Sequence, residues 1–287
     1  MSQPTRNAPM PVQAPPVVDE PGLAPLLDLA SRAAVPTPGP ALRERLLGRL
    51  ARQRSQAGGI VNARRRELAA QPLAHGVSQT ILYRAADLAK LRPGEPLCVR
   101  LIALAPGAVM DAATLSGPDA PDRPQHHREW LVMEGDAQCD GQGLSLRDYR
   151  VVPAGQPCAR WATSSGALLF LRESALPAQP GDEAITVFDA EAGWPELVPG
   201  IRRRVLWQRG GQAALLYHAD AGAHLPRHTH GHDEECLMLQ GDLFLDDVLL
   251  RPGDYQLAPA GSSHELTETD TGVVIYAHAD LAMQFVG

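Results

Sequence analysis

Three histidines and one glutamate near the end of this 287-residue chain are spaced as ligands of one metal ion. They lie in two glycine-framed runs, residues 222–241 and 253–264. Neutral imidazoles with one carboxylate suit a divalent ion such as Zn²⁺, Fe²⁺, Mn²⁺, Ni²⁺ or Cu²⁺. Buried histidines without a metal are the alternative, but four ligands at two matched places favour a metal site. The candidate ligands are His228, His230, Glu234 and His264.

Short β-strands must position these four side chains. Side chains at i and i+2 of a strand point to one face, so His228 and His230 can contact one ion together. Glu234 begins the run Glu-Glu-Cys-Leu-Met-Leu-Gln-Gly, which predicts a buried strand ending in a turn. The segment Pro259-Ala-Gly predicts a tight turn that brings His264 onto the next strand.

The two runs resemble the metal-binding motifs of the cupin superfamily. The first follows G-x5-H-x-H-x3-E-x6-G, and the second follows G-x5-P-x-G-x2-H. The family has an asparagine four residues after the last histidine, where this chain has Glu268. The resemblance covers about residues 184–287 and implies a double-stranded β-helix, or jelly-roll barrel, with the ion inside. It implies the ligand set His228, His230, Glu234 and His264.

A repeated strand pattern predicts two tandem copies of this barrel. Trp130-Leu-Val-Met-Glu-Gly parallels Cys236-Leu-Met-Leu-Gln-Gly, and three further pairs of segments match in the same order. Many short strands with glycine turns are typical of an all-β barrel. We therefore expect an all-β bicupin with a degenerate barrel at residues 74–175, a linker at 175–182 and a metal-binding barrel at 184–287.

The first copy lacks the metal ligands. Ala113 and Leu115 stand where the second copy has its paired histidines, and Cys158 stands where it has the last one. We expect the first barrel to be a metal-free partner that stabilises the second and shapes its entrance. In the alternative interpretation Glu129 takes the carboxylate position, and a site is rebuilt from His126, His127, Glu129 and Cys158.

Other polar residues of the second copy have two interpretations each. Cys236 faces the predicted barrel interior, where it could sense oxidants or serve as a small apolar core residue. His218 and His278 lie on predicted strands, where they could orient a ligand or form ordinary hydrogen bonds. His224 and His232 lie on predicted loops near the barrel mouth and are candidate acid–base groups.

Composition excludes several classes of function. A net charge of −7 argues against extensive nucleic-acid binding, and an aromatic content of 5% argues against base-stacking surfaces. No apolar run approaches the length of a membrane span, and the first residues lack the order of a signal peptide. The four cysteines form no C-x-x-C motif, so we expect reduced thiols in a cytoplasmic protein.

The N-terminal segment, residues 1–73, is of a different kind. Its ten prolines within residues 1–40 predict a largely disordered or polyproline-like stretch. Residues 41–54 form a predicted amphipathic helix with leucines on one face and arginines on the other, and residues 23–32 are a shorter helix candidate. With Arg64–Arg66, this basic segment could contact a partner protein, an acidic membrane surface or RNA, or pack on its own barrel.

A narrower resemblance joins the two regions. The sequence at residues 38–50 is similar to the end of the anti-sigma domain of ChrR-type proteins, and the cupin is similar to theirs. That family represses a sigma factor until an oxidative signal arrives, through a zinc-binding anti-sigma domain joined to a cupin. The zinc motif is missing here, because the first histidine is His75 and the first cysteine is Cys98. The resemblance therefore implies that residues 1–73 are a remnant of the anti-sigma domain.

Two functions from different classes follow. A regulatory protein would sense an oxidant or a small ligand in the second barrel and contact a sigma factor or another protein through the basic helix at residues 41–66. An enzyme would use Fe(II) to cleave a small diketone or hydroxyacetophenone with O₂, as some ChrR-like cupins do. Four protein ligands leave two open positions on an octahedral ion but none on tetrahedral zinc, so the metal decides. Regulation is our leading prediction, and the sequence is compatible with a homodimer.

Overall fold

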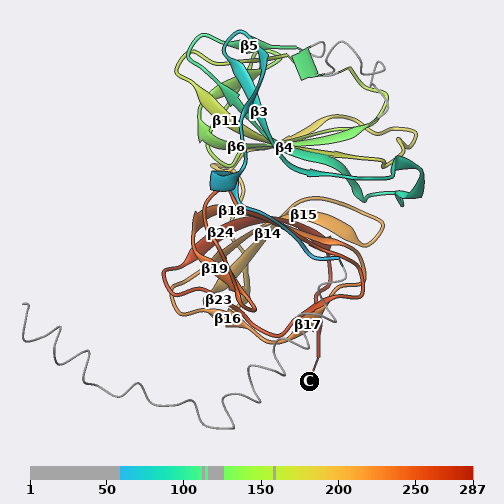
Figure 1. The fold of residues 1–287 in the computed structure, drawn as a ribbon, viewed down its shortest axis with the longest axis vertical. Coiled ribbons are helices and arrows are strands. Elements are labelled where there is room, and N and C mark those ends of the chain that lie inside the picture. Colours follow the sequence, from blue (N-terminus) through green and yellow to red (C-terminus); the bar gives the residue numbers. More distant parts are fainter. Residues whose placement is uncertain (1–58, 112–113, 116–125, 158–159, 287) are drawn as a thin grey trace, which may run out of the picture. The chain divides into compact units, whose positions relative to one another are not determined.

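The computed structural model describes residues 59–111, 114–115, 126–157 and 160–286, which belong to one compact unit. These residues form two jelly-roll barrels of antiparallel strands (Figure 1), which confirms the predicted all-β bicupin fold. The predicted proline-rich stretch and the helices at residues 23–32 and 41–54 lie outside the described residues. Within the described part, no helix is long and apolar enough to cross a membrane.

The first barrel pairs one large sheet with one small sheet. The large sheet has the order β12 (Ile185–Val187), β9 (Tyr149–Val152), β6 (His127–Gly135), β11 (Ala167–Ser174), β4 (Pro96–Leu104), β3 (Val77–Arg84) and β2 (Gln71–Ala74). The small sheet has the order β5 (Val109–Met110), β10 (Trp161–Ala162), β7 (Ala137–Cys139) and β8 (Gln142–Leu144). A 3-10 turn, η2 (Leu88–Lys90), joins β3 to β4.

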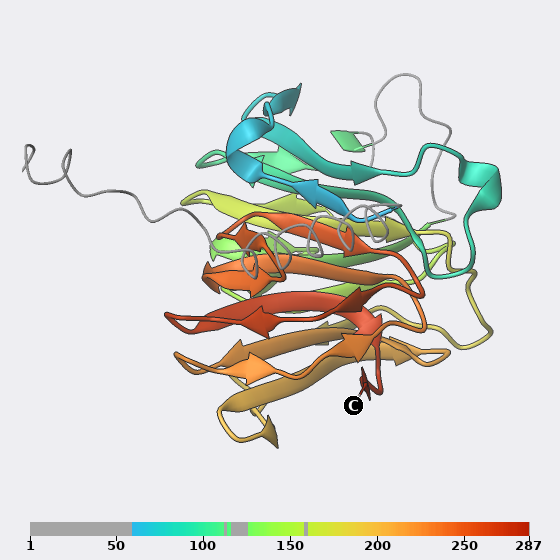
Figure 2. The ribbon, with the colours of Figure 1, turned by 60° about the horizontal axis from the view of Figure 1, so that its bottom comes forward.

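The second barrel, most of whose strands are orange and red in Figure 2, pairs one large sheet with two small sheets. Its large sheet has the order β1 (Val61–Ala63), β21 (Tyr255–Ala258), β18 (Glu234–Gly241), β24 (Val273–Asp280), β15 (Gln212–Ala219), β14 (Ile201–Arg209) and β13 (Glu196–Val198). Its small sheets are β16 (His224–Leu225), β23 (Thr267–Glu268), β19 (Leu243–Leu245) and β20 (Val248–Leu250), and β22 (Ser263–His264), β17 (His228–Thr229) and β25 (Gln284–Phe285).

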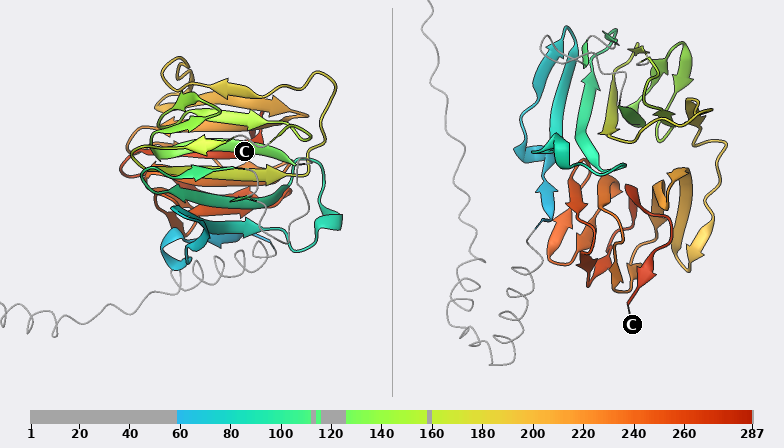
Figure 3. Two further views of the ribbon diagram at one scale, coloured as in Figure 1. Left: turned by 90° about the horizontal axis from the view of Figure 1, so that it is seen from above. Right: turned by 90° about the vertical axis from the view of Figure 1, so that its right-hand side faces the viewer.

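The two barrels exchange their edge strands. Strand β1 precedes the first barrel in sequence but pairs with β21 of the second, and β12 follows the first barrel and pairs with its β9. In Figure 3, right, the blue strand β1 lies beside the orange strands of the second barrel. The boundaries at residues 74 and 184 stay predictions, and the structure adds that each barrel is completed by a strand from beyond them.

The prediction that the basic helix continues to residue 66 is wrong. Residues 61–63 form a strand and Arg65–Glu67 form the 3-10 turn η1, because the open edge of β21 offers backbone partners to the chain. Arg64 then bonds to the carboxylate of Asp254 at 3.1 Å, and the Arg65 amide donates to the same carboxylate at 3.0 Å. The arginine patch therefore packs partly on its own second barrel, which was one of the two alternatives for it.

The two large sheets pack against each other through one apolar cluster. It includes Leu131 and Phe170 from the first barrel and Leu237 and Tyr276 from the second. Each barrel also encloses its own apolar cluster between its large and small sheets. The interface therefore holds strand β18 from one face, while the other face of β18 lines the barrel interior.

Buried charges lie in the middle of this interface. Arg172 on β11 donates to Glu129 at 2.8 Å and to Glu235 on β18 at 2.7 Å. Glu129 also accepts hydrogen bonds from Tyr149 and Tyr276, and Tyr255 donates to Glu235, each at 2.8 Å. The remaining members of this interface cluster are two buried histidines whose Nε2 atoms lie 3.7 Å from Glu129: His127 and His278.

We expect acid to destabilise the fold through His278. Burial first, and then the charge of Arg172, lower the pKa of His278 to about 3, against the opposing charge of Glu129. His127 and His232, which also act on this ring, lower its pKa further. Because the unfolded histidine binds its proton near pH 6.5, stability is lost as the pH falls from 6.5 towards 3, by about 3 kcal/mol at pH 4.

Urea unfolding of metal-free protein at pH 7 and pH 4 measures this loss. The control variant His278→Gln lacks the titrating group, so it should lose about 3 kcal/mol less than the wild type between the two pH values. Equal losses in both proteins would show that His278 does not carry the effect. Glu129, whose pKa is lowered to about 2, keeps its charge across this range.

Candidate metal centre

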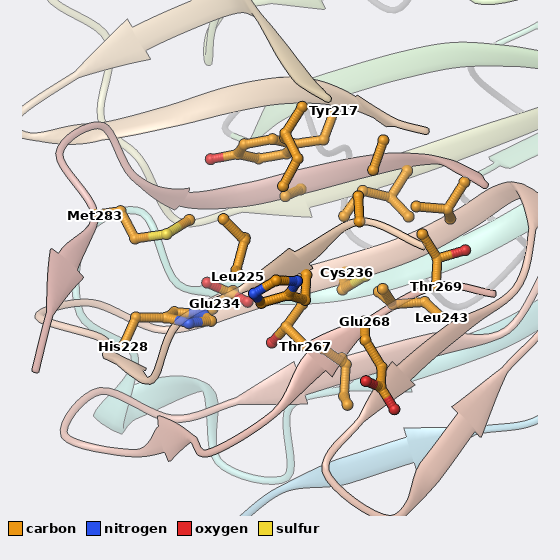
Figure 4. A pocket seen from close by; sticks show the side chains of 18 residues that line it. Tyr217, Leu225, His228, Glu234, Cys236, Leu243, Thr267, Glu268, Thr269 and Met283 are labelled. Atoms are coloured by element: carbon orange, nitrogen blue, oxygen red, sulfur yellow. The ribbon is translucent and has the colours of Figure 1, made fainter. Parts of the chain in front are cut away.

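Three of the four predicted ligands come together where β17 ends and β18 begins. His228 lies on β17, His230 follows it by two residues, and Glu234 is the first residue of β18. Ligand atoms of all three lie within 4.8 Å of one another. Figure 4 shows His228 beside Glu234 on the wall of the second barrel's interior. The i, i+2 spacing on a strand thus places both histidines on one side, as the sequence predicts.

His264 reaches the same group from strand β22. Its Cα pairs directly with that of His228 across β17 and β22. Its ring centroid lies 5.7 Å from that of His228 and 5.2 Å from that of His230. Its Nε2 atom lies 4.0 Å from an oxygen of Glu234. His264 therefore lies beside the group that His228, His230 and Glu234 form.

The polar atoms of this group fit a cation. His228 is oriented by its Nδ1, 3.1 Å from the Pro226 carbonyl, and His264 by its Nδ1, 3.2 Å from Asp246. The Nε2 atoms of His230 and His264 are buried without a hydrogen-bond partner. Buried nitrogen atoms normally have a partner, so these two are suited to a ligand that the protein itself does not supply.

The electrostatics of the group also favour a cation. Burial lowers the pKa of His228 and keeps its imidazole neutral. Burial alone would raise the pKa of Glu234, but the hydrogen bond and charge of His230, with the other two histidines, lower it to about 2. Burial likewise opposes protonation of His230, while Glu234 raises its pKa overall, through a contact of 3.0 Å. A carboxylate that stays ionised among imidazoles is a cation-binding arrangement.

Asp246 is the residue that the sequence analysis missed. It lies in the turn between β19 and β20 with a left-handed backbone (φ 55°). Its carboxylate contacts His264 and accepts the backbone amides of Glu265 at 2.8 Å and Leu266 at 3.1 Å. A carboxylate on the far nitrogen of a ligating imidazole orients the ring and increases its basicity. Its only sequence signal is an aspartate in a hairpin turn, which is common in turns without any ligand.

A largely apolar chamber adjoins the metal-binding group. Its cavity volume is about 60 Å³, and it opens to solvent. His228 and Glu234 form one part of its wall, with Cys236 and Thr267 next to them in Figure 4. Further lining residues are Tyr217, Leu225, Leu243, Leu245, Glu268, Thr269, Ile275 and Met283.

The other histidines of the second barrel do not join the group. His278 lies in the interface cluster, and His218 contacts Arg202 on the outer side of β15. His232 pairs with Asp280 in a cleft between the barrels. Of these other histidines, only His224, which is exposed, lines the chamber.

Cys236 faces the chamber as predicted, but its thiol has low reactivity. Burial, followed by the charge of Glu234, raises the pKa of its thiol well above the ordinary value. Only a thiolate reacts readily with oxidants or binds a metal. The role as a small apolar core residue is therefore the better of its two interpretations.

In the first barrel the carboxylate position is occupied by an arginine. In β18 Glu234 pairs with Ala258 of β21, and in β6 Arg128 pairs with Val152 of β9 at the equivalent place. Glu129 corresponds to Glu235 and faces the interface. The proposed rebuilt site around Glu129 is therefore wrong, because strand alternation turns its side chain out of the barrel.

Other residues of the first barrel also differ from the proposed ligands of the second barrel. Arg128 and Arg100 both contact the buried carboxylate of Glu173. Leu115, at the place of His230, packs against the apolar interior. Ala113 and Cys158 lie outside the described residues. A guanidinium group thus occupies the place that a ligating carboxylate has in the second barrel.

Comparison with known proteins agrees with this architecture. Residues 182–284 match the family model of the ChrR cupin-like domain. No curated protein matches the sequence significantly. Among solved structures, a candidate dioxygenase from Nostoc punctiforme has a TM-score of 0.55 at 13% identity, over 80% of this chain and 84% of the other.

Two further solved structures are similar. A candidate glyoxylate-induced protein from Pseudomonas aeruginosa has a TM-score of 0.61 at 13% identity, over 78% of this chain and 90% of the other. Oxalate decarboxylase from Lactobacillus farciminis has a TM-score of 0.57 at 12% identity, over 78% and 87%. At such identities the likeness shows the fold.

Proposed function

We propose that the second barrel, which matches the model of the ChrR cupin-like domain, binds one divalent metal ion. The observation that carries the proposal is the pair of buried, unpartnered imidazole nitrogens beside an ionised carboxylate. The proposed ligands are His228, His230, Glu234 and His264. Zinc and iron(II) suit this set, and so do manganese, nickel and copper.

We further propose that the ion holds a small, mostly apolar molecule through its oxygen atoms. His228 and Glu234 line the chamber directly, so a molecule in the chamber would lie against the metal-binding group. A bound ion would polarise such oxygen atoms as a Lewis acid and, if it were iron, support chemistry with O₂. The apolar walls, among them Leu225 and Ile275, exclude water from the ligand.

Regulation is the first use that we propose for this binding. The match to the ChrR cupin-like domain supports it, with an oxidant or small ligand as the signal. Because the Cys236 thiol stays protonated, the signal would act at the metal rather than at this cysteine. The proposed partner is a sigma factor or another protein bound through residues 41–66, of which 41–58 lie outside the described residues. None of the three described cysteines forms a disulfide, which supports the proposed cytoplasmic location.

A dioxygenase that cleaves a small diketone is the second candidate. It is supported by the direct contact between the chamber and the metal-binding group, which gives a substrate access to the ion. The candidate dioxygenase of the same fold from Nostoc punctiforme is in line with it.

One experiment separates the two candidates. The protein is purified without oxygen, its metal content is measured, and it is loaded with Fe(II). O₂ uptake is then followed with acetylacetone. Uptake that requires both protein and diketone would establish the enzyme, whereas diketone binding without uptake supports a ligand-sensing role. Protein that takes up no divalent ion at all would contradict both.

A further inference from the structure

The interior of the first barrel is filled by two tryptophans. Trp130 on β6 and Trp161 on β10 are both fully buried, and their ring centroids lie 4.9 Å apart. Both belong to the apolar cluster between the large and small sheets of that barrel. Two indole rings therefore occupy the interior at the level where β6 and β10 face each other.

The strand register identifies the residue that replaces Trp130 in the second barrel. In the first barrel Trp130 pairs with Leu171 across β6 and β11. In the second barrel Cys236 pairs with Ala277 across β18 and β24, the two equivalent strands. The large side chains of Trp130 and Leu171 in the first barrel are thus replaced by the small side chains of Cys236 and Ala277 in the second.

The residue that replaces Trp161 follows from the small sheets. Strand β10 lies between β5 and β7 and places Trp161 opposite Met110 and Cys139. Strand β23 lies between β16 and β19 and places Thr267 opposite Leu225 and Leu245. Thr267 therefore stands at the place of the second indole.

The volume that the indoles fill in the first barrel belongs to the chamber in the second. Cys236 and Thr267 both line the chamber, together with Glu234 (Figure 4). The hydroxyl of Thr267 is buried without a hydrogen-bond partner. Such a group costs free energy unless something in the chamber bonds to it, so it points to a ligand with a polar atom at that place.

The charged residues of the chamber wall also restrict the charge that a ligand can carry. Among the described residues that line the chamber, none is a lysine or an arginine. Two carboxylates, Glu234 and Glu268, are part of the wall. A small dianion would add two further negative charges without a cationic side chain at the wall to pair with. A neutral or singly charged molecule suits this chamber better.

We propose that Cys236 and Thr267 determine ligand size, and that the chamber takes an oxygen chelator carrying one flat apolar ring. The ring occupies the space that indoles fill in the first barrel, and a polar atom accepts a hydrogen bond from Thr267. This inference rests on the proposed metal function, because the chelating oxygens would need the ion beside His228 and Glu234.

Three probes test it on full-length protein loaded with manganese(II), because an octahedral ion keeps two positions open beside four protein ligands: acetylacetone, its phenyl analogue benzoylacetone, and oxalate. Isothermal titration gives the affinity for each. Because the phenyl ring would be buried, we expect benzoylacetone to bind at least about tenfold more tightly than acetylacetone, and oxalate to bind most weakly. Equal affinities for the two diketones, or oxalate as the tightest ligand, would overturn the proposal.

Variants of Thr267 locate the ring. Thr267→Trp restores the residue of the first barrel and should weaken the binding of benzoylacetone at least about tenfold, with acetylacetone less affected and manganese content unchanged. Thr267→Val keeps the shape but removes the hydroxyl, and should weaken the diketones about three- to tenfold. If Thr267→Trp does not fold, the valine variant decides, and undiminished affinity in it refutes the role of the hydroxyl.

Failure of this inference can be distinguished from failure of the metal proposal. Manganese binding with acetylacetone affinity but no preference for the phenyl ring would refute the ligand class alone. Wild-type protein that binds no divalent ion would refute the metal proposal. Leu249→Trp is a matched control, because Leu249 lies on β20 and is not among the lining residues. It should leave all three affinities unchanged.

Discussion

His264→Ala is expected to reduce the metal affinity of the protein by more than about a hundredfold. The substitution removes one of the four proposed ligands, and removal of a residue that only orients a ligand already costs about 10- to 100-fold in metal affinity. The barrel itself should persist, because the apolar clusters on both faces of the large sheet do not include His264. Competition with a chromophoric chelator gives the affinity, and elemental analysis gives the metal content.

Two further variants define this result. Asp246→Asn keeps the shape of the residue that orients His264 but removes its charge, so its affinity should fall between those of wild type and His264→Ala. His224→Ala is the control, since His224 lines the chamber but is exposed and not a proposed ligand. Unchanged metal content in His264→Ala, or equal losses in all three variants, would contradict the ligand assignment.

Arg172→Met is expected to lower the free energy of unfolding by about 3–5 kcal/mol. Arg172 is the only partner of opposite charge among the described residues within hydrogen-bond distance of Glu129 and Glu235. Methionine preserves much of the volume, so the loss comes mainly from the two buried carboxylates left without a cation. Urea unfolding of the metal-free protein at pH 7 measures it.

Arg202→Ala is the matched control for this prediction. Arg202 also contacts a carboxylate, that of Asp220 at 3.2 Å, but both side chains are substantially exposed. Exposed ion pairs contribute at most about 1 kcal/mol, so this variant should unfold close to the wild type. Similar small effects for both arginines would show that the interface cluster does not hold the barrels together. A milder loss in the double variant Arg172→Met/Glu129→Gln would support the charge explanation.

The all-β fold and the grouping of the four candidate ligands could be predicted from the sequence because both depend on local patterns. Strand alternation places His228 and His230 together, and the turn before His264 sets its approach. The repeat of segments such as the one beginning at Trp130 predicts the second barrel. These signals are contained within a few residues of each feature.

Features that depend on distant partners could not be predicted in the same way. Strand β1 has three residues, and it exists because β21, more than 190 positions later, offers a free edge. Asp246 contacts the metal-binding group through a hairpin turn that carries no metal motif. The alternative prediction that Glu129 takes the carboxylate position fails for a simpler reason. The long insertion at residues 116–125 hides the strand register, in which Arg128 is the equivalent of Glu234.

The metal content of the wild-type chain tests the central claim most directly. Metal-free, full-length protein is loaded with excess zinc, freed of unbound ion and weighed by native mass spectrometry. Our account predicts one ion for each chain, because the second barrel brings His264 beside the group of His228, His230 and Glu234, while Arg128 and Leu115 occupy the corresponding positions of the first. Two ions for each chain, or none, would contradict it.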